Sequence, residues 1–305
     1  DEAEEVARGL APLIEHDRVL DIIGGAAGCI AGLESLNNVR SSDRAITAAA
    51  LCAERLLATA IPSEGGIAWP GVIQVAKPLT GFSHGAAGMA RSLLAASSMT
   101  GDRRFREAAL GAMEYERAVF VEEEQNWPDF RTGSGSGESR STGSILAWCH
   151  GAPGIGLGRL ASLAHYDDPK IRSEIDTALD VTLKRGFGLN HSLCHGDLGN
   201  IDLLLEAGVK LDSPLWRERA RLLAGVILES INSNGWLCGV PMGVETPGLM
   251  TGLAGIGYGL LRLADPARVP SVLSLAPPPA ARNGGSPARF QKDTVGESSV
   301  LEIAR

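Results

Sequence analysis

Residues 148–160 read WCHGAPGIGLGRL, and residues 193–205 read LCHGDLGNIDLLL. In each, Cys-His-Gly follows the first residue, a second glycine comes three residues after the first glycine, and mostly small or apolar residues continue from there. The same Gly-x-x-Gly pattern recurs at 22–33, 82–94 and 249–261. The five first glycines are Gly25, Gly85, Gly151, Gly196 and Gly252. Each interval between them has room for two helices and a loop, so the chain is an array of repeated units.

The segments between these motifs carry their own helix signals. Ser213-Pro214 precedes a long apolar-periodic run, and Asp168-Pro169 opens KIRSEIDTALDVTLKR. A capping side chain followed by proline is a typical helix start. A third, alanine-rich helix is expected from Asp43. We therefore expect an all-α protein of helix pairs, in which the member that begins at Gly-x-x-Gly faces the interior.

Loops with Gly, Trp and Pro separate the pairs at 64–71, 126–139 and 234–248. The stretch GSGSGESRSTGS from Gly133 has the composition of a flexible lid or surface loop. Residues 276–305 are rich in Pro and Gly and show no periodicity. We expect a packed domain over 1–275 and a disordered tail over 276–305.

Composition excludes several classes of protein. The net charge of −8, without a basic stripe, argues against a nucleic-acid partner. The sequence shows neither a signal peptide nor an apolar run long enough for a membrane span. Five cysteines are too few and too spread out to read as a disulfide framework in a chain of 305 residues. A reduced, cytoplasmic setting with free thiols fits best.

The cysteines of the repeated motif point to a metal site. If the repeats surround a centre, equivalent positions converge there, so that Cys149, Cys194 and one histidine can surround a single ion. Two thiolates and an imidazole suit Zn²⁺, and three protein ligands leave a fourth position open, as catalytic zinc sites do. His84 occupies the matching register without a cysteine, and is either a ligand or an acid/base.

Other candidates have plainer interpretations. A buried cysteine is more often a small hydrophobic residue than a ligand, which is the expectation for Cys29, Cys52 and Cys238. An aspartate just before a helix usually caps it, as Asp21 would. The remaining histidines lie off the motif register and are expected on the surface or in loops: His16, His165 and His191.

Taken together, these motifs resemble the lanthionine cyclase (LanC-like) family. The match rests on GFSHGAAG, WCHGAPGIGLGRL, LCHGDLGN and GLMTGLAGIGYGLL in that order. The Trp-Cys-His-Gly-Ala-Pro-Gly form is similar to the C-terminal cyclase domain of a class II lanthipeptide synthetase (LanM type). The resemblance implies an α/α toroid of seven helix pairs. With five motifs visible, we expect an N-terminally truncated toroid, in a larger protein with an N-terminal dehydratase domain.

The resemblance also implies an activity and roles for residues. One zinc ion, held by Cys149, Cys194 and His195, would bind a cysteine thiol of a dehydrated precursor peptide (leader plus core). The thiolate would add to dehydroalanine or dehydrobutyrine, forming a lanthionine or methyllanthionine thioether. His84 and Asp21 match the family's acid/base or positioning groups, and His150 is included with them because it adjoins the first zinc cysteine.

This sequence departs from the stand-alone cyclases at one position of the site. They carry an arginine four residues before the first zinc cysteine, where this chain has Ile145. Arg140 or Arg159 is a candidate to replace it. The class II form tolerates the change, so the expected zinc ligands stand.

Two other functions remain open. One is a LanC-like module that binds zinc and a thiol such as glutathione without cyclising a peptide. The other is a different zinc-thiolate alkyl-transfer enzyme on an α/α barrel, such as a prenyltransferase β subunit. Retention of His84 and Asp21 beside the expected ligands favours the cyclase over the module. The paired Cys-His-Gly triplets disfavour the transferase.

Overall fold

The computed structural model describes residues 2–72, 75, 77–131 and 145–277, and over these residues it is almost entirely helical. In chain order the elements are α1 (Glu2–Gly9), α2 (Ala11–Ile14), α3 (Ala26–Val39), α4 (Asp43–Thr59), β1 (Ile61–Ser63), β2 (Gly66–Ala68), α5 (Ala86–Thr100), α6 (Arg103–Ala118), α7 (Ala152–Ser162), α8 (Pro169–Arg185), α9 (Asp197–Lys210), α10 (Pro214–Asn234), the 3₁₀ turn η1 (Pro241–Gly243) and α11 (Leu253–Ala264).

The helices begin where side chains satisfy the free N–H groups of the first turn. Asp168 accepts a hydrogen bond from the backbone N–H of Lys170 (2.8 Å) at the start of α8. Ser213 does the same for Trp216 (3.4 Å) in α10, and Ser42 for Ala45 (3.2 Å) in α4. The three helices expected from Asp43, Asp168 and Ser213 are thus present with their caps.

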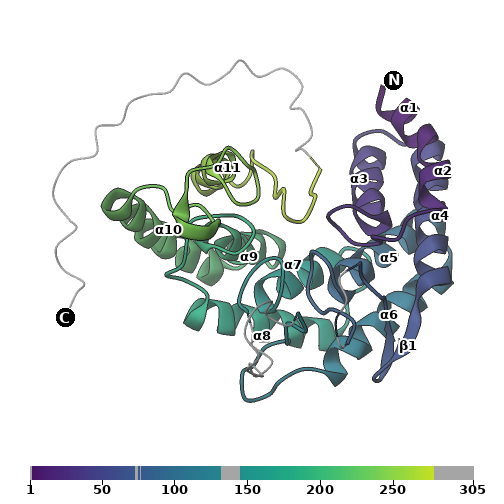
Figure 1. The fold of residues 1–305 in the computed structure, drawn as a ribbon, viewed down its shortest axis with the longest axis horizontal. Coiled ribbons are helices and arrows are strands. Elements are labelled where there is room, and N and C mark those ends of the chain that lie inside the picture. The colour runs from purple at the N-terminus through teal and green to yellow at the C-terminus, as the bar shows by residue number, and fades with distance from the viewer. Residues whose placement is uncertain (1, 73–74, 76, 132–144, 278–305) are drawn as a thin grey trace.

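The helices form two layers around an arc (Figure 1). The inner helices α3, α5, α7 and α9 pack on one another in chain order, and each also packs on its outer partner: α4, α6, α8 or α10. Helices α5, α7 and α9 are buried along most of their length, whereas α4, α6 and α8 bury one face. This two-layer arrangement confirms the predicted all-α toroid of helix pairs.

Each inner helix and α11 begins after the first glycine of the motif, and the second glycine lies under the preceding loop. A Cβ at Gly154 would lie 1.9 Å from the Trp148 carbonyl oxygen, and one at Gly199 would lie 1.9 Å from that of Leu193. The equivalent contact in the other three repeats is 1.8–2.2 Å. The repeated motif is therefore a steric requirement, because it lets each loop fold back onto its own helix.

One expected loop is a hairpin in the structure. Residues 61–63 and 66–68 pair antiparallel, with Ile61 opposite Ala68, around a turn in which Gly65 has φ +72°. Gly66 packs so closely on α6 that a Cβ would lie 2.0 Å from the Gly111 carbonyl oxygen. The Gly and Trp residues of this stretch are typical of loops, so the sequence did not predict its short strands.

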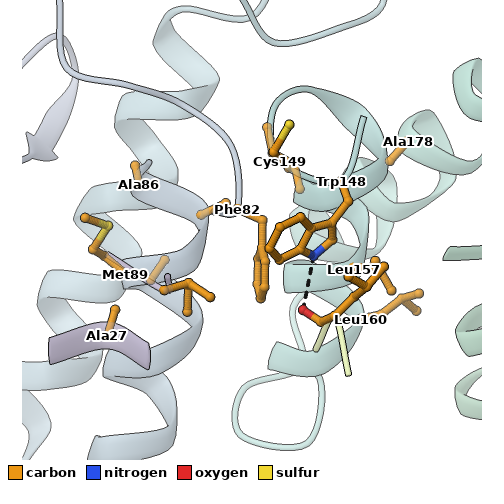
Figure 2. Packing of buried hydrophobic residues seen from close by; sticks show 14 of the residues in the cluster. Ala27, Phe82, Ala86, Met89, Trp148, Cys149, Leu157, Leu160 and Ala178 are labelled. Atoms are coloured by element: carbon orange, nitrogen blue, oxygen red, sulfur yellow. Dashed lines mark hydrogen bonds between the residues drawn. The ribbon is translucent and has the colours of Figure 1, made fainter. Parts of the chain in front are cut away.

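The core continues from helix to helix through the loops before α5 and α7. Phe82 meets Trp148 edge to face, with ring centroids 6.0 Å apart (Figure 2). The Trp148 indole N–H donates to the Leu273 carbonyl (3.1 Å), and the Ser35 hydroxyl donates to that of Leu275 (2.7 Å). The segment after α11 thus returns across the arc to α3.

Two expectations from the sequence fall partly or wholly beyond what the structure describes. The predicted flexible loop from Gly133 lies outside the described residues, as does the predicted tail from residue 278 onward. Among the helices that are described, none combines the length and apolarity needed to cross a bilayer.

Candidate metal centre

The loops that precede the inner helices are joined to each other by backbone hydrogen bonds at one register. Ser83 donates to the Cys149 carbonyl (3.3 Å), Cys149 to that of Cys194 (3.2 Å), and Cys194 to that of Met250 (2.8 Å). Each of these residues lies two positions before the first glycine of its motif. This ladder brings the equivalent positions of four repeats to one end of the fold, so residues far apart in the sequence become neighbours.

The ladder places Cys149, Cys194 and His195 together. One ligand atom from each of the three lies within 4.8 Å of those of the other two, a separation compatible with a shared metal ion. Among the residues that the structure describes, no other group of three or more Cys, His, Asp or Glu side chains meets this criterion. Cys149 is buried, while Cys194 and His195 are half-buried, so the cluster is open to solvent on one side.

The two cysteine thiols titrate as a pair. Their mutual hydrogen bond is the largest influence: it raises the pKa of Cys149, which burial raises further, and lowers the pKa of Cys194. The positive charge of Arg131 also lowers the pKa of both thiols. Of the two thiols, Cys194 is therefore the one that loses its proton more readily.

His84 lies on the neighbouring loop and is paired with Asp21. The His84 Nδ1 is 2.7 Å from Asp21 Oδ2, and the His84 side chain is 32% exposed whereas that of Asp21 is 5% exposed. The other carboxylate oxygen of Asp21 accepts from the backbone N–H groups of Ile23 and Gly24 (both 2.9 Å). Asp21 thus caps the turn before α3, in line with its plainer interpretation, and orients a half-exposed imidazole as well.

His150 is buried beside these groups. It has no exposed surface, its ring centroid is 5.9 Å from that of His84, and neither ring nitrogen has a hydrogen-bond partner among the described residues. Burial, reinforced by the nearby Arg131 charge, lowers the pKa of His150 to about 4. The His150 ring is therefore neutral at physiological pH.

A second loop covers His195 from the other side. A Cβ at Gly239 would lie 2.8 Å from His195 Nε2 and 2.5 Å from Ser192 Oγ, so a larger residue there would have to displace these side chains. An open pocket with a volume of about 540 Å³ is lined by His195, Asn190 and residues 237–241. The cluster thus has an adjoining space in which a substrate can lie.

His191 holds this covering loop, and its burial was not foreseen from the sequence. It lies in a loop, as expected, but it is fully buried rather than on the surface. Its backbone N–H donates to the Leu237 carbonyl (2.8 Å), and its Nδ1 accepts from the Leu237 N–H (3.1 Å). The Nε2 lies 3.0 Å from Ser230 Oγ. No local pattern marked His191, because its partners lie about 40 residues away in the chain.

The remaining candidates lie elsewhere. Arg159 is buried between Glu116 (2.8 Å) and Glu174 and bonds both, so it does not replace the arginine missing at Ile145; Arg140 is outside the described residues. Cys29 and Cys52 hydrogen-bond to each other between α3 and α4, which lowers the pKa of Cys29 to about 7. His16 is exposed, and His165, in the turn after α7, lies 2.8 Å from Glu34.

The sequence analysis missed Asp129 and Arg131. Arg131 donates to both carboxylate oxygens of the buried Asp129, and its charge acts on the cysteine thiols and on His150. The stretch NWPDFR at 126–131 looked like an ordinary loop. The only signal was a pair of opposite charges two residues apart, which is common in loops that bind nothing.

The fold and the site together give the class of this protein: a toroid of helix pairs with a Cys₂His cluster at one end. The chain belongs to the family described as Lanthionine synthetase C-like protein, whose family model matches residues 1–274. The resemblance drawn from the motifs is thereby confirmed.

A curated relative and a solved structure agree with this assignment. The lacticin 481/lactococcin biosynthesis protein LcnDR2 of Lactococcus lactis subsp. lactis is 26% identical over 255 residues, which are 79% of this chain and 25% of the relative. The chain therefore spans about a quarter of that relative's length. The structure of a nisin cyclase superposes with a TM-score of 0.59 at 18% identity, covering 89% of this chain and 71% of the cyclase. At that identity the likeness shows the fold alone.

Proposed function

We propose that this chain is the cyclase domain of a class II lanthipeptide synthetase and forms thioether rings with one catalytic zinc ion. The observation that carries the proposal is the Cys149, Cys194 and His195 cluster, which lies on the same set of loops as the His84–Asp21 pair. A nucleophile-activating site and a proton-transfer pair in adjacent loops are what addition of a thiol to a dehydroamino acid requires.

The donor set of the cluster fits zinc. Two cysteine sulfurs and one imidazole nitrogen are ligands that Zn²⁺ prefers, and three protein ligands leave a position for an incoming thiol. Zinc held there would bind a substrate cysteine and lower the pKa of its thiol, so that the thiolate is the nucleophile at neutral pH. The opening toward solvent at Cys194 and His195 gives the substrate access.

The His84–Asp21 pair would handle the proton. Asp21 accepts a hydrogen bond from His84 Nδ1, which leaves Nε2 as the nitrogen that takes or gives a proton. We assign His84 to deliver a proton to the α-carbon after the carbon–sulfur bond has formed. Asp21 stabilises the protonated imidazole and fixes its orientation. His150 is neutral and has no surface toward solvent, so we assign it to packing against His84 rather than to proton transfer.

The partners follow from this assignment. The substrate would be a dehydrated precursor peptide, a leader joined to a core with cysteines and dehydroamino acids. LcnDR2 is named as a lacticin 481/lactococcin biosynthesis protein and is four times as long as the matched segment. By analogy, we expect a dehydratase domain N-terminal to the cyclase domain in the same protein and a cytoplasmic location, where cysteine thiols stay reduced.

Ring formation with a dehydrated precursor supplied in trans tests the proposal. Cyclisation leaves the peptide mass unchanged, so remaining cysteines are counted by alkylation with N-ethylmaleimide, against a sample without protein. We expect about one equivalent of zinc and a protein-dependent loss of thiols. Cys194→Ala should lose both, while Cys52→Ala, at a buried cysteine in α4 outside the cluster and its adjoining pocket, should keep both.

Three outcomes would count against the proposal. Ring formation by Cys194→Ala would remove the zinc mechanism. Zinc binding by the wild-type protein without loss of peptide thiols would favour a binding module, especially if glutathione bound at the cluster. Alkylation of the thiols by a prenyl diphosphate would favour the transferase alternative.

A further inference from the structure

Residues 126–128, which follow α6, are fixed to two loops of the candidate active site. Asn126 is fully buried; its amide N–H donates to the Ile145 carbonyl (3.1 Å), and its amide oxygen accepts from the Ala152 N–H (2.8 Å). The Thr80 hydroxyl donates to the Pro128 carbonyl (2.7 Å). Residues 126–128 are therefore anchored between the loop that carries His84 and the loop that carries the first cysteine.

Directly after these anchors, Asp129 holds Arg131. Asp129 is 8% exposed, and its carboxylate accepts from the Arg131 Nε (2.9 Å), Nη2 (2.6 Å) and backbone N–H (3.1 Å). Burial acts to raise the pKa of Asp129, but the bonds from Arg131 outweigh it, so the carboxyl is ionised. A bidentate pair of this kind fixes the orientation of the guanidinium group.

Arg131 lies beside the candidate active site. It follows Pro128 by three residues, and the Pro128 carbonyl accepts from Thr80; a Cβ at the next residue, Gly81, would lie only 3.0 Å from the Cys149 carbonyl oxygen. In keeping with this position, the charge of Arg131 lowers the pKa of the Cys149 and Cys194 thiols. The guanidinium is half-buried, and its Nη1 forms no hydrogen bond with any described residue. Arg131 is thus a fixed cation with unused N–H donors beside the sulfur cluster.

Addition of a thiolate to a dehydroamino acid creates a negative charge that such a cation can stabilise. As the sulfur bonds to the β-carbon, the π electrons of the C=C bond move toward the adjacent acyl group and charge develops on its oxygen. The α-carbon then takes a proton, and the acyl C=O bond is restored. Preorganised N–H donors near that oxygen lower the barrier, because they need not reorganise during the reaction.

We propose that Arg131, held by Asp129, is a catalytic residue that donates hydrogen bonds to the acyl oxygen of the dehydroamino acid while the thiolate adds. The proposal rests on the proposed cyclase function. Arg131 would thus give the site a positive charge, which Ile145 lacks and which Arg159 does not bring to the site.

Steady-state ring formation by Arg131 variants tests this role. Arg131→Gln removes the charge at similar length, and Arg131→Lys keeps the charge without the planar fork. We expect Arg131→Gln to lower kcat about 10²-fold, the loss typical of one oxyanion donor, with KM little changed and Arg131→Lys between the two. Arg268→Gln, at a remote and 85% exposed arginine, is the control and should match the wild type.

Two further measurements separate this role from a structural one. In Arg131→Ala, millimolar guanidinium should restore part of kcat, because it can occupy the vacated position. With Co²⁺ in place of zinc, the sulfur-to-cobalt absorption band that appears on adding a peptide thiol should be the same in Arg131→Gln and the wild type.

The possible failures are distinguishable. Wild-type kcat in Arg131→Gln would overturn this inference alone. Loss of metal, or of the cobalt–thiol band, in parallel with kcat and without guanidinium rescue would make Arg131 a structural residue. A wild-type protein that binds zinc but closes no ring would overturn the proposed function and this inference with it.

Discussion

Replacing Gly154 by alanine should damage the metal centre through the backbone alone. The new Cβ would lie 1.9 Å from the Trp148 carbonyl oxygen and 3.0 Å from Phe82 Cβ. An ordinary C···O contact is about 3.3 Å, so the carbonyl must retreat by about 1.4 Å. That carbonyl belongs to the peptide bond that leads into Cys149, and ligand distances in metal sites are held to about 0.2 Å.

Strain and geometry therefore act together in this variant. Overpacking a buried site costs about 1–3 kcal/mol, which exceeds the gain of about 0.5–1 kcal/mol that alanine brings to a helix interior. Gly225→Ala is the matched control, because a Cβ at that position in α10 meets nothing within 4 Å. Gly154→Ala should lower the free energy of unfolding and lose zinc. Gly225→Ala should raise the free energy of unfolding and keep zinc.

Urea denaturation and zinc content of the purified variants measure these two effects. If Gly154→Ala were as stable as Gly225→Ala and held a full equivalent of zinc, the repeated glycine would not be a steric requirement. The link drawn between the motif and the position of Cys149 would then be wrong.

Three other perturbations test separate parts of the site. Asp21→Asn should keep zinc and lower kcat by about 10²–10⁴-fold, the range for lost acid/base catalysis, and an unchanged kcat would remove the pair from the mechanism. Gly239→Ala should push His195 away, since its Cβ would lie 2.8 Å from Nε2, and weaken zinc binding in a competition titration with a chelator. Burial lowers the pKa of His191 in the folded protein, against the opposing effect of the Asp197 charge. In the unfolded chain His191 has its ordinary pKa of about 6.5, so just below that pH the unfolded chain binds more protons than the folded protein. The free energy of unfolding should therefore fall as pH drops through that value, and His191→Gln should flatten this dependence; an equal slope in both proteins would contradict it.

The repeated motif carries most of what the sequence tells about the fold. Gly-x-x-Gly has a local steric cause, the contact of the second glycine with the carbonyl six residues earlier, so it can be recognised without a structure. Helix starts at Asp168 and Ser213 were equally local. The hairpin at 61–68 was not recognised, because its stability comes from Gly66 packing on α6, a contact that no local pattern encodes.

The residues of the site also divide into those that a local pattern marks and those that depend on long-range contacts. Cys149, Cys194 and His195 share the register of the repeat, and the backbone ladder that joins their loops is a consequence of that repetition. His191 depends on long-range partners instead, and Arg131 depends on long-range bonds of Asn126 and Pro128 that anchor its loop. Their burial and charge environment arise only when the loops meet, which is why Arg131 was overlooked and the burial of His191, expected on the surface or in a loop, was not foreseen.

X-ray absorption at the zinc edge tests the central claim most directly. In the zinc-loaded protein we expect two sulfurs at about 2.3 Å and at least one nitrogen at about 2.0–2.1 Å, and a third sulfur when a peptide with a free cysteine is added. That increase would show a protein-bound metal with an open position that takes the substrate thiol. A zinc shell that does not change on adding the peptide thiol would contradict the account, since the metal would then be structural.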